Sequence, residues 1–426
     1  MESAYDAVVV GSGFGGGIVA CRLAEHGWHV CVLESGRRFG PGDYPDRPEQ
    51  APRMFWHARH NPGGMFDLRI MKDVAVMTGA GVGGGSLVYA NVQLRAPDDV
   101  FDDPAWPASL DAASLRPYYD RTEAALDPRT TPADPPLPKV RAFDAMAARA
   151  GLESERLPIA VHFGEDRLHC RRLRRLSPAL GTRFSGNGDA LSLAIDPQEP
   201  GVAGARTEYG PTMTSRIDLD ADQGMMVADG GLPQSFGGLL QIVRGISAIT
   251  GLGRVALRAK DLAARAGLSD RQVTHRNVTL DRRMAPVGDT LVFLNIGRDA
   301  ADGRMRLTWP FRCLDIRWSK AASAALFDRM RRVAGELAQA SGATSFFALD
   351  AGPLGKFITV HPLGGCPMSD DPRMGVVDEH GAVHGYDGLV VLDGSIVPTS
   401  LGVNPSKTIA ALAERGVETL IARGRP

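Results

Sequence analysis

The chain has few cysteines, almost no net charge and no long apolar run. Its 426 residues include five cysteines, which are Cys21, Cys31, Cys170, Cys313 and Cys366. An odd number without a C-x-x-C pair argues against a disulfide framework or a zinc site, and indicates a reducing, cytoplasmic location. A net charge of −1 gives no sign of a nucleic-acid partner. The apolar runs are too short for an integral membrane segment, and the first begins too close to Met1 for a signal peptide.

Glycine, by contrast, is abundant and clustered. Of the 50 glycines, many fall into three groups, at residues 11–17, 79–85 and 364–365. They follow no short period, so they are not a collagen-like or linker signal. Clustered glycine indicates backbone that bends sharply or lies close to another group. These segments are therefore the first candidates for a binding site.

The first cluster lies in a predicted strand–helix–strand unit. An apolar run at 5–10 predicts a strand, and residues 11–16 read G-S-G-F-G-G. An apolar-periodic helix follows to about residue 25, and residues 29–33 predict a second strand that ends at Glu34. This order of elements is typical of a dinucleotide-binding unit. The alternative is a glycine-rich turn of an α/β protein with no ligand.

Residue types in this turn suit a dinucleotide. Gly11 permits a tight turn, Gly13 lets the backbone approach a pyrophosphate, and Gly16 allows close contact between helix and strand. The turn also contains Phe14, and the helix after Gly13 supplies N–H donors and partial positive charge. Glu34 can accept hydrogen bonds from a ribose diol, which favours FAD or NAD over NADP.

The second cluster is too rich in glycine for the interior of a strand or helix, because it holds five glycines in seven residues. A flexible turn is the simplest interpretation. Two glycine-rich turns in one chain, however, suit a large cofactor with a pyrophosphate and a second ring system, such as FAD. We therefore take as candidate cofactor contacts Gly79, Gly83, Gly84, Ser86 and Asn91. Residues 38–70, between the clusters, predict either an irregular surface segment with buried aromatics or a lid.

The rest of the chain alternates predicted helices with short strands. Helices are expected near residues 98–126 (after a loop), 140–150, 236–251 and 321–342, and a proline-rich connector covers 128–138. Strands are expected at 158–163, 191–195, 290–296 and 389–392. Residues 205–355 therefore predict an α+β unit separate from the N-terminal one.

The C-terminal segment places a histidine, a turn and a helix start within about fifty residues. His361 begins the sequence H-P-L-G-G-C, and Asp393 and Gly394 turn after the strand expected at 389–392. Asn404 fits an N-cap and Pro405 the first position of a helix that runs to about residue 422. Taken alone, His361 is more simply a structural histidine.

Together these segments resemble the glucose–methanol–choline (GMC) oxidoreductase family, and in particular its sterol-oxidising members. The matching stretches are 8–34, 79–91, 321–330 and 361–415, of which the last is the most specific. The resemblance implies an α/β fold, with a Rossmann-like FAD-binding domain of discontinuous segments and an α+β substrate domain with an antiparallel sheet. The expected spans are 1–204 for the main FAD-binding part, 205–355 for the substrate-binding domain, and 356–426 for the return to the FAD-binding domain.

The same resemblance assigns roles to site residues. His361 matches the base of the family and Asn404 its partner. FAD would lie with its pyrophosphate at the helix after Gly13 and its isoalloxazine near residues 83–91, Asp393 and Gly394. A neutral imidazole would take the proton of an alcohol, because imidazole titrates near neutral pH, while the flavin takes a hydride. Asn404 would hold the substrate oxygen, and dioxygen or another electron acceptor would reoxidise the flavin.

The resemblance also implies a substrate, a small-molecule alcohol. A 3β-hydroxysteroid such as cholesterol, or another hydrophobic alcohol, would be oxidised to a ketone or aldehyde. Sterol oxidases place a glutamate before an Ala-Pro in the substrate domain, whereas the similar stretch here, Arg282–Pro286, has arginine. Family members also carry an apolar strand after the proline-rich connector. None is visible between 151 and 188, which indicates an internal deletion near Cys170. A sheet without those strands would leave apolar faces unpaired, so a catalytically impaired or inactive relative is the alternative.

Overall fold

The computed structural model describes residues 4–40, 42–44, 50, 53–71, 73–131, 136–160, 177–219, 224–231, 290–308, 314–350 and 356–425. Three features of the sequence lie outside these residues: the expected deletion point at Cys170, the helix expected at 236–251, and the stretch Arg282–Pro286.

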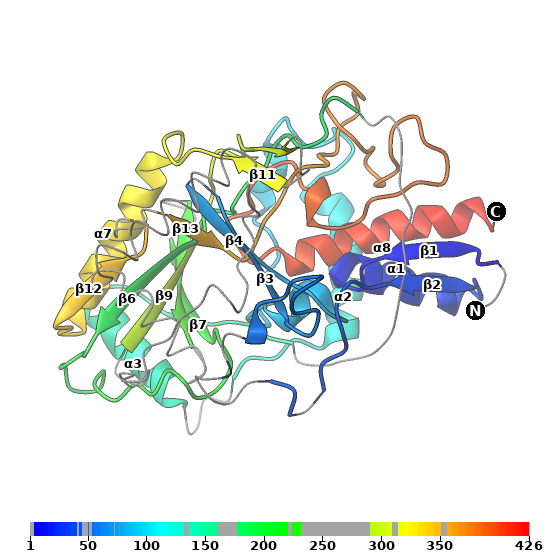
Figure 1. Cartoon of the computed structure of the whole chain (residues 1–426). Helices are drawn as coiled ribbons and strands as arrows, with labels where there is room; N and C mark the ends of the chain where they lie inside the picture. The colour runs from blue at the N-terminus through cyan, green and yellow to red at the C-terminus, as the bar shows by residue number, and fades with distance from the viewer. Residues whose placement is uncertain are drawn as a thin grey trace.

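A strand–helix–strand unit opens the chain and lies beside its last helix. β1 (Ala7–Val10) and β2 (Val30–Leu33) pair in parallel, and α1 (Phe14–Glu25) connects them. α8 (Ser406–Arg423) lies along α1, so the two termini lie at the same end of the molecule (Figure 1). These bounds confirm the predicted N-terminal unit and C-terminal helix.

Apolar packing and an ion pair join α1 to α8. Leu23 of α1 and Val417 of α8 belong to one buried cluster. The guanidinium of Arg22 donates to the carboxylate of Glu414 at 2.8 Å, and Glu414 is buried. The two ends of the chain therefore form one packed unit.

The β1–β2 sheet is covered on one face. Strand residues alternate between faces, and Ala7 and Val9 of β1 pack toward the α1–α8 cluster. Val8 and Val10 lie on the opposite face and are 57% and 66% exposed. Among the described residues these two strands form a sheet of their own. The apolar face left open by β1 is what a missing segment of the sheet would leave.

The prediction of a further strand at 389–392 is wrong. Val390 forms an isolated bridge with Ala382, and the N–H of Val391 donates to the carbonyl of Gly381. A neighbouring turn thus takes the backbone groups that a strand would offer to the β1–β2 sheet. Within 158–160, the described part of the strand expected at 158–163, Ile159 forms isolated bridges.

A six-stranded antiparallel sheet forms the other half of the molecule (Figure 1). Its order is β12-β6-β9-β8-β7-β5. The strands are β5 (Glu155–Arg156), β6 (Ala190–Ile195), β7 (Ser215–Leu219), β8 (Met225–Gly230), β9 (Thr290–Gly297) and β12 (Ser345–Ala348). The helices α3 (Pro138–Arg149) and α7 (Ala324–Ala340) pack on one face of it. The predicted antiparallel sheet is confirmed, and β5 and β6 bring residues from before position 205 into it.

A small central sheet has the order β13-β4-β3. β3 (Phe66–Ile70) pairs antiparallel with β4 (Val74–Gly79), whereas β13 (Phe357–Thr359) pairs parallel with β4. Phe55 and Phe66 are buried in a cluster beside it. The segment 38–70 therefore contains buried aromatics and one strand that the sequence analysis did not predict. Because β4 and β13 are parallel, the glycine cluster after β4 and His361 after β13 leave the sheet in the same direction.

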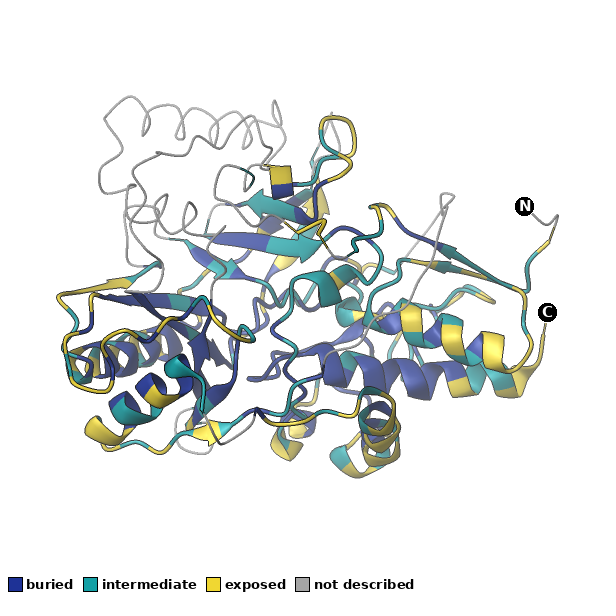
Figure 2. Ribbon diagram, turned by 90° about the horizontal axis from the view of Figure 1, so that it is seen from below, coloured by how far each residue is buried: buried dark blue, intermediate teal, exposed yellow. Residues whose placement is uncertain are grey.

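The remaining elements connect these layers. They are η2 (Gly84–Leu87), η3 (Asp98–Asp102), α2 (Ala112–Leu126), β10 (Arg304–Leu307), β11 (Leu314–Arg317) and η7 (Gly394–Ile396). Figure 2 shows that α8 is buried along most of its length, between α1 and α2. In the part of the chain that the structure describes, no helix is both long and apolar enough to cross a membrane.

Candidate functional site

His361 and Asn404 meet in the structure although 43 residues separate them. The imidazole Nε2 of His361 lies 3.2 Å from the amide Nδ2 of Asn404. The backbone N–H of His361 donates to the hydroxyl of Thr359, at the end of β13, at 2.9 Å. Both side chains are largely buried, with 10% of His361 exposed. The structure therefore brings together the two residues expected as base and partner.

Asp189 contacts the other side of His361 and was not predicted. Its Oδ1 lies 2.8 Å from Nδ1 of His361. Its Oδ2 accepts from the hydroxyl of Thr359 and the N–H of Val360, each at 3.0 Å. Asp189 follows the turn signal Gly186-Asn187-Gly188 and stands directly before an apolar strand, and this position was the available signal.

Asn187, in the same turn, holds the segment before Asn404 and was also missed. It is fully buried, with φ of +54°. Its Oδ1 accepts from the N–H groups of Leu401 (2.7 Å) and Gly402 (3.2 Å), and its Nδ2 donates to the carbonyl of Val403 at 2.7 Å. One turn thus positions the histidine through Asp189 and the asparagine through Asn187.

A second buried carboxylate, that of Asp299, fixes this turn. It accepts from the hydroxyl of Ser185 (2.7 Å) and from the N–H groups of Gly186 (2.9 Å) and Gly188 (3.2 Å). Burial raises the pKa of Asp299 above its usual value. The turn at 185–189 is therefore held by several hydrogen bonds.

The helix start differs from the prediction by one residue. Pro405 occupies the N-cap and Ser406 the first helical position, and no side chain caps α8. Asn404 turns its Nδ2 toward His361 and toward Sδ of Met213 at 3.8 Å, and its buried Oδ1 has no hydrogen-bond partner among the described residues. Asn404 is therefore not the cap, and the positive end of the α8 dipole carries no side-chain acceptor.

The first glycine turn leaves the start of α1 open. Gly11 has φ of +89°, and a Cβ on Gly16 would lie 2.0 Å from the carbonyl oxygen of Gly11, so both positions require glycine. Gly13 is the N-cap of α1, without a side-chain cap or an acid in the first turn. The nearest atoms to a Cβ on Gly13 lie at 3.9 Å. These N–H groups are free to bind an anion such as a phosphate.

Glu34 ends β2 as predicted, but its carboxylate is already hydrogen-bonded. Oε2 accepts from the N–H (3.1 Å) and hydroxyl (2.9 Å) of Ser12. Oε1 accepts from the N–H (2.7 Å) and hydroxyl (3.1 Å) of Ser35, and from the N–H of Gly36 at 3.2 Å. Glu34 is buried. A ribose diol would therefore have to replace some of these donors, because a carboxylate offers about four acceptor sites.

The second glycine cluster packs against the first. A Cβ on Gly84 would lie 3.0 Å from Cα of Gly13, and the N–H of Gly83 donates to the hydroxyl of Ser12 at 3.0 Å. A Cβ on Gly79 would clash with the carbonyl of Gly84 at 2.0 Å. The two turns therefore form one continuous backbone surface.

The other predicted contacts adjoin this surface. The ring of Phe14 meets Tyr89 edge-on, with 5.0 Å between centroids. The N–H of Ser86 donates to the carbonyl of Gly83, which closes the turn. Asn91 has φ of +63°, and its carbonyl accepts from the N–H of Ala160 at 2.8 Å.

Asp393 and Gly394 connect the glycine turns to the histidine segment. A Cβ on Gly15 in α1 would lie 1.7 Å from the carbonyl oxygen of Leu392, so the backbone before Asp393 touches α1. The N–H of Gly364, three residues after His361, donates to the carbonyl of Gly394 at 3.1 Å. The predicted site residues therefore occupy one connected region.

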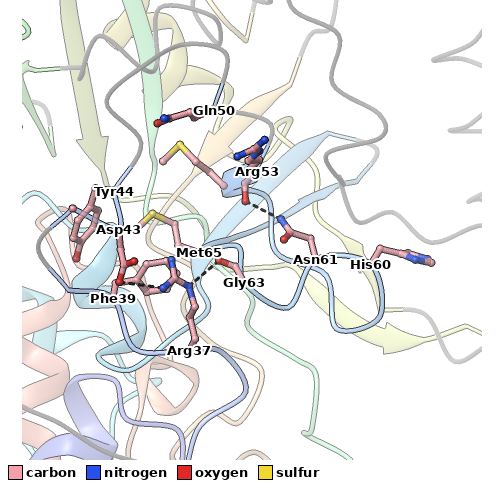
Figure 3. A pocket seen from close by; sticks show the side chains of 12 residues that line it. Arg37, Phe39, Asp43, Tyr44, Gln50, Arg53, His60, Asn61, Gly63 and Met65 are labelled. Carbon is pink, nitrogen blue, oxygen red and sulfur yellow. Dashed lines mark hydrogen bonds and ion pairs between the residues drawn. The ribbon is translucent and has the colours of Figure 1, made fainter.

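A cavity of about 610 Å³ lies beside this region (Figure 3). Its lining comes from residues 37–65, and Arg37 forms an ion pair with Asp43 at 3.1 Å and donates to the carbonyl of Gly63. The carbonyl of Arg37 accepts from the N–H of Val82, so the cavity wall adjoins the second glycine turn. None of the predicted site residues lines this cavity.

Comparison with known proteins identifies the segment that carries His361 and Asn404. Residues 315–413 match the family model described as GMC oxidoreductase. The chain carries a GMC oxidoreductase domain. Residues 9–64 match a model described as an NAD(P)-binding Rossmann-like domain, which covers the first glycine turn and Glu34. The resemblance drawn from the sequence is confirmed, and the GMC family implies a flavin cofactor.

Similarity to known relatives extends over nearly the whole chain. A cholesterol oxidase of Mycobacterium tuberculosis is 26% identical, over 97% of this chain and 91% of the relative. A long-chain-alcohol oxidase of Arabidopsis thaliana is 23% identical, over 96% of this chain and 66% of the relative. The alignment to the cholesterol oxidase spans 556 positions, more than the 426 residues of this chain. That relative therefore has residues without counterparts here.

The fold of this chain also has solved counterparts. Pyridoxine 4-oxidase from Mesorbium loti superposes with a TM-score of 0.65 at 14% identity, over 98% of this chain and 99% of the other. The layered arrangement of Rossmann-like unit and antiparallel sheet is thus shared by proteins that differ widely in sequence.

Proposed function

We propose that this protein oxidises an alcohol with FAD as hydride acceptor, and that His361 is the base and Asn404 the hydrogen-bonding partner of the substrate oxygen. The observation that carries the proposal is the pair of polar atoms 3.2 Å apart, Nε2 of His361 and Nδ2 of Asn404. A hydroxyl oxygen can lie within hydrogen-bonding distance of both, since one can accept its proton and the other can donate to its lone pair. Burial of both side chains limits exchange with water and favours a fixed orientation of the alcohol.

The residues present fit a flavin dinucleotide at two places. The uncapped start of α1 behind Gly13 supports a pyrophosphate, and the uncapped start of α8 supports the electron-rich end of a flavin ring. The contacts proposed for it are Gly11, Gly13, Phe14, Gly16, Glu34, Gly79, Gly83, Gly84, Ser86, Asn91, Asp393, Gly394, Asn404 and Pro405. When bound, the flavin supplies an acceptor for the hydride of the carbinol carbon and passes its electrons to dioxygen or another acceptor.

The relatives support a hydrophobic alcohol as substrate, and the sheet face that follows Asp189 is apolar, with Leu193 and Val292 buried. Residues of β6 alternate between faces, so Leu191 and Leu193 follow Asp189 on the face opposite α3 and α7. Across the sheet they pair with Leu294 and Val292 of β9, and all four belong to one apolar cluster. The proposed substrate is therefore a 3β-hydroxysteroid such as cholesterol, or a long aliphatic alcohol, oxidised to a ketone or aldehyde. Cholesterol oxidases and long-chain-alcohol oxidases are among the relatives.

One observation favours a second candidate function, a relative that keeps the motifs but has lost catalysis. Val8 and Val10 of β1 are exposed on one face of the β1–β2 sheet, as expected if a deletion near Cys170 removed a segment that covered it. If binding of the FAD nucleotide requires the missing segment, the flavin does not bind. His361 and Asn404 would then have no hydride acceptor beside them.

The visible absorption spectrum of the purified protein separates the two. Bound-flavin bands that bleach under anaerobic conditions with cholesterol or a long-chain alcohol support the first function. A colourless protein that takes up no added FAD refutes it and favours the second.

A further inference from the structure

The buried carboxylate of Asp189 contacts the proposed base directly. Its Oδ1 lies 2.8 Å from Nδ1 of His361, and the two side chains are 8% and 10% exposed. An ionised carboxylate accepts hydrogen bonds and donates none. A hydrogen bond at this position therefore requires a proton on Nδ1 of His361.

The orientation of this carboxylate is fixed by other donors. Oδ2 of Asp189 accepts from the hydroxyl of Thr359 and from the N–H of Val360, each at 3.0 Å. The hydroxyl of Thr359 has a second acceptor in the carbonyl of Gly186, at 3.0 Å. Rotating the carboxylate away from the imidazole would, however, take its acceptor from the N–H of Val360, and an unpaired N–H in a largely buried place is costly. Oδ1 is thereby kept toward the ring.

The opposite nitrogen of the ring has a partner of matching type. In a neutral imidazole with Nδ1 protonated, Nε2 is an acceptor, and Nδ2 of Asn404 lies 3.2 Å from it as a donor. A flipped amide would place Oδ1 of Asn404 against Nε2, which requires a proton there. The contacts on both sides of His361 thus agree on one tautomer.

We infer that Asp189 is a positioning residue that holds neutral His361 as the Nδ1–H tautomer. In this tautomer Nε2 is unprotonated and can accept the proton of the substrate hydroxyl. The inference deepens the proposed function and rests on His361 being the base. The substrate O–H proton would move to Nε2, and a bound flavin would supply the acceptor for the hydride of the carbinol carbon, so that a ketone or aldehyde would form. The imidazolium that results then lies against a carboxylate, which favours its positive charge.

Asp299 provides a matched control. It is also a buried aspartate and holds the same turn through Ser185, Gly186 and Gly188. Among the described residues, the donors to its side chain are these three and the N–H of Ala301, and His361 is not one of them. Asp299→Asn therefore reports the support of the turn. Asp189→Asn also removes the charge, and because Thr359 and Val360 would hold its amide oxygen, it turns an NH2 donor toward the imidazole.

The test uses nitrogen NMR of the full-length protein labelled with 15N-histidine, with the resonances of His361 assigned by their loss in His361→Gln. The wild type above neutral pH is expected to show a protonated Nδ1 and a bare Nε2, and Asp299→Asn the same. In Asp189→Asn a large share of the molecules is expected to carry the proton on Nε2. A wild-type spectrum with the proton on Nε2 overturns the inference, even if Asp189→Asn does not fold. This measurement needs no flavin. It can therefore test the tautomer of His361 even if the proposed function is wrong.

A second test measures the rate of flavin reduction by the alcohol in anaerobic stopped-flow experiments. Asp189→Asn is expected to slow the reduction by roughly 10- to 100-fold with little change in apparent substrate affinity. Asp299→Asn should lower the melting temperature. An Asp189→Asn variant that reduces its flavin at the rate of the wild type would refute the role.

Discussion

Gly15 marks the point where the C-terminal segment touches the first helix, and alanine there should separate them. A Cβ on Gly15 would lie 1.7 Å from the carbonyl oxygen of Leu392 and 2.8 Å from its carbonyl carbon. Non-bonded carbon and oxygen atoms stay about 3.3 Å apart. The two backbones would therefore have to separate by roughly 1.5 Å, a distance equal to the rise of a helix per residue. Neither side of the contact is a flexible side chain that could turn away.

The expected magnitude follows from two opposing effects. Overpacking of this kind costs about 1–3 kcal/mol, and a backbone-to-backbone clash belongs at the upper end. Alanine regains about 1 kcal/mol of helix propensity, which leaves Gly15→Ala destabilised by about 2 kcal/mol. Gly17 is the matched control, because it is exposed in the same helix and the nearest atom to its Cβ is 3.6 Å away. Gly17→Ala should therefore stabilise the protein by about 0.5–1 kcal/mol.

Thermal unfolding followed by circular dichroism, with and without FAD, measures both variants. Gly15→Ala should melt below the wild type and bind FAD more weakly, because the displaced backbone includes Asp393 and Gly394. Gly17→Ala should melt at or above the wild type. A Gly15→Ala protein as stable as the wild type would show that Leu392 does not lie on α1, and would remove the contact that joins the two halves of the site.

Three further predictions concern other parts of the molecule. His361→Ala should abolish anaerobic flavin reduction yet retain bound flavin; normal reduction in this variant would refute the assigned base. Burial raises the pKa of Tyr119 to about 12 from the usual 10.0, so its contribution to stability is complete below pH 10 and is lost as pH rises through about 12. An ultraviolet absorbance titration should show this late ionisation, and Tyr119→Phe should lose it; if both proteins titrate alike, the ring is not buried. Val8→Thr and Val10→Thr should each change the free energy of unfolding by less than about 0.5 kcal/mol, and a larger loss in thermal denaturation would mean that the open face is covered in solution.

Local signals were sufficient for the elements nearest each glycine turn. The strand–helix–strand unit fits within 30 residues, from the strand before Gly11 through the helix that ends at Glu25 to the acid Glu34. The sequence pattern of this short stretch therefore predicts the whole unit. The signals for the helix of the C-terminal segment were equally local, and its predicted end near residue 422 lies one residue before the observed end at Arg423. Such elements depend on neighbours in sequence, and periodicity and glycine positions report those neighbours.

What the sequence did not predict depends on distant partners. Asp189 is 172 residues from His361, and Asn187 is 214 residues from Leu401, so no spacing rule connects them. The segment 389–392 has the composition of a buried strand, yet its backbone pairs with a nearby turn, since the sheet it would join offers it no place. Asn404 fits a cap by type and position, but its side chain turns to His361 instead.

The pairing of α1 with α8 has a consequence for synthesis of the protein. The β1–α1–β2 unit leaves the ribosome well before its covering helix α8, because Arg22 and its partner Glu414 are 392 residues apart. At about 5–20 residues per second, the unit waits roughly 20–80 s with Leu23 uncovered. The nascent chain therefore passes through a period in which α1 is open to aggregation or to chaperone binding, and this period ends when α8 emerges.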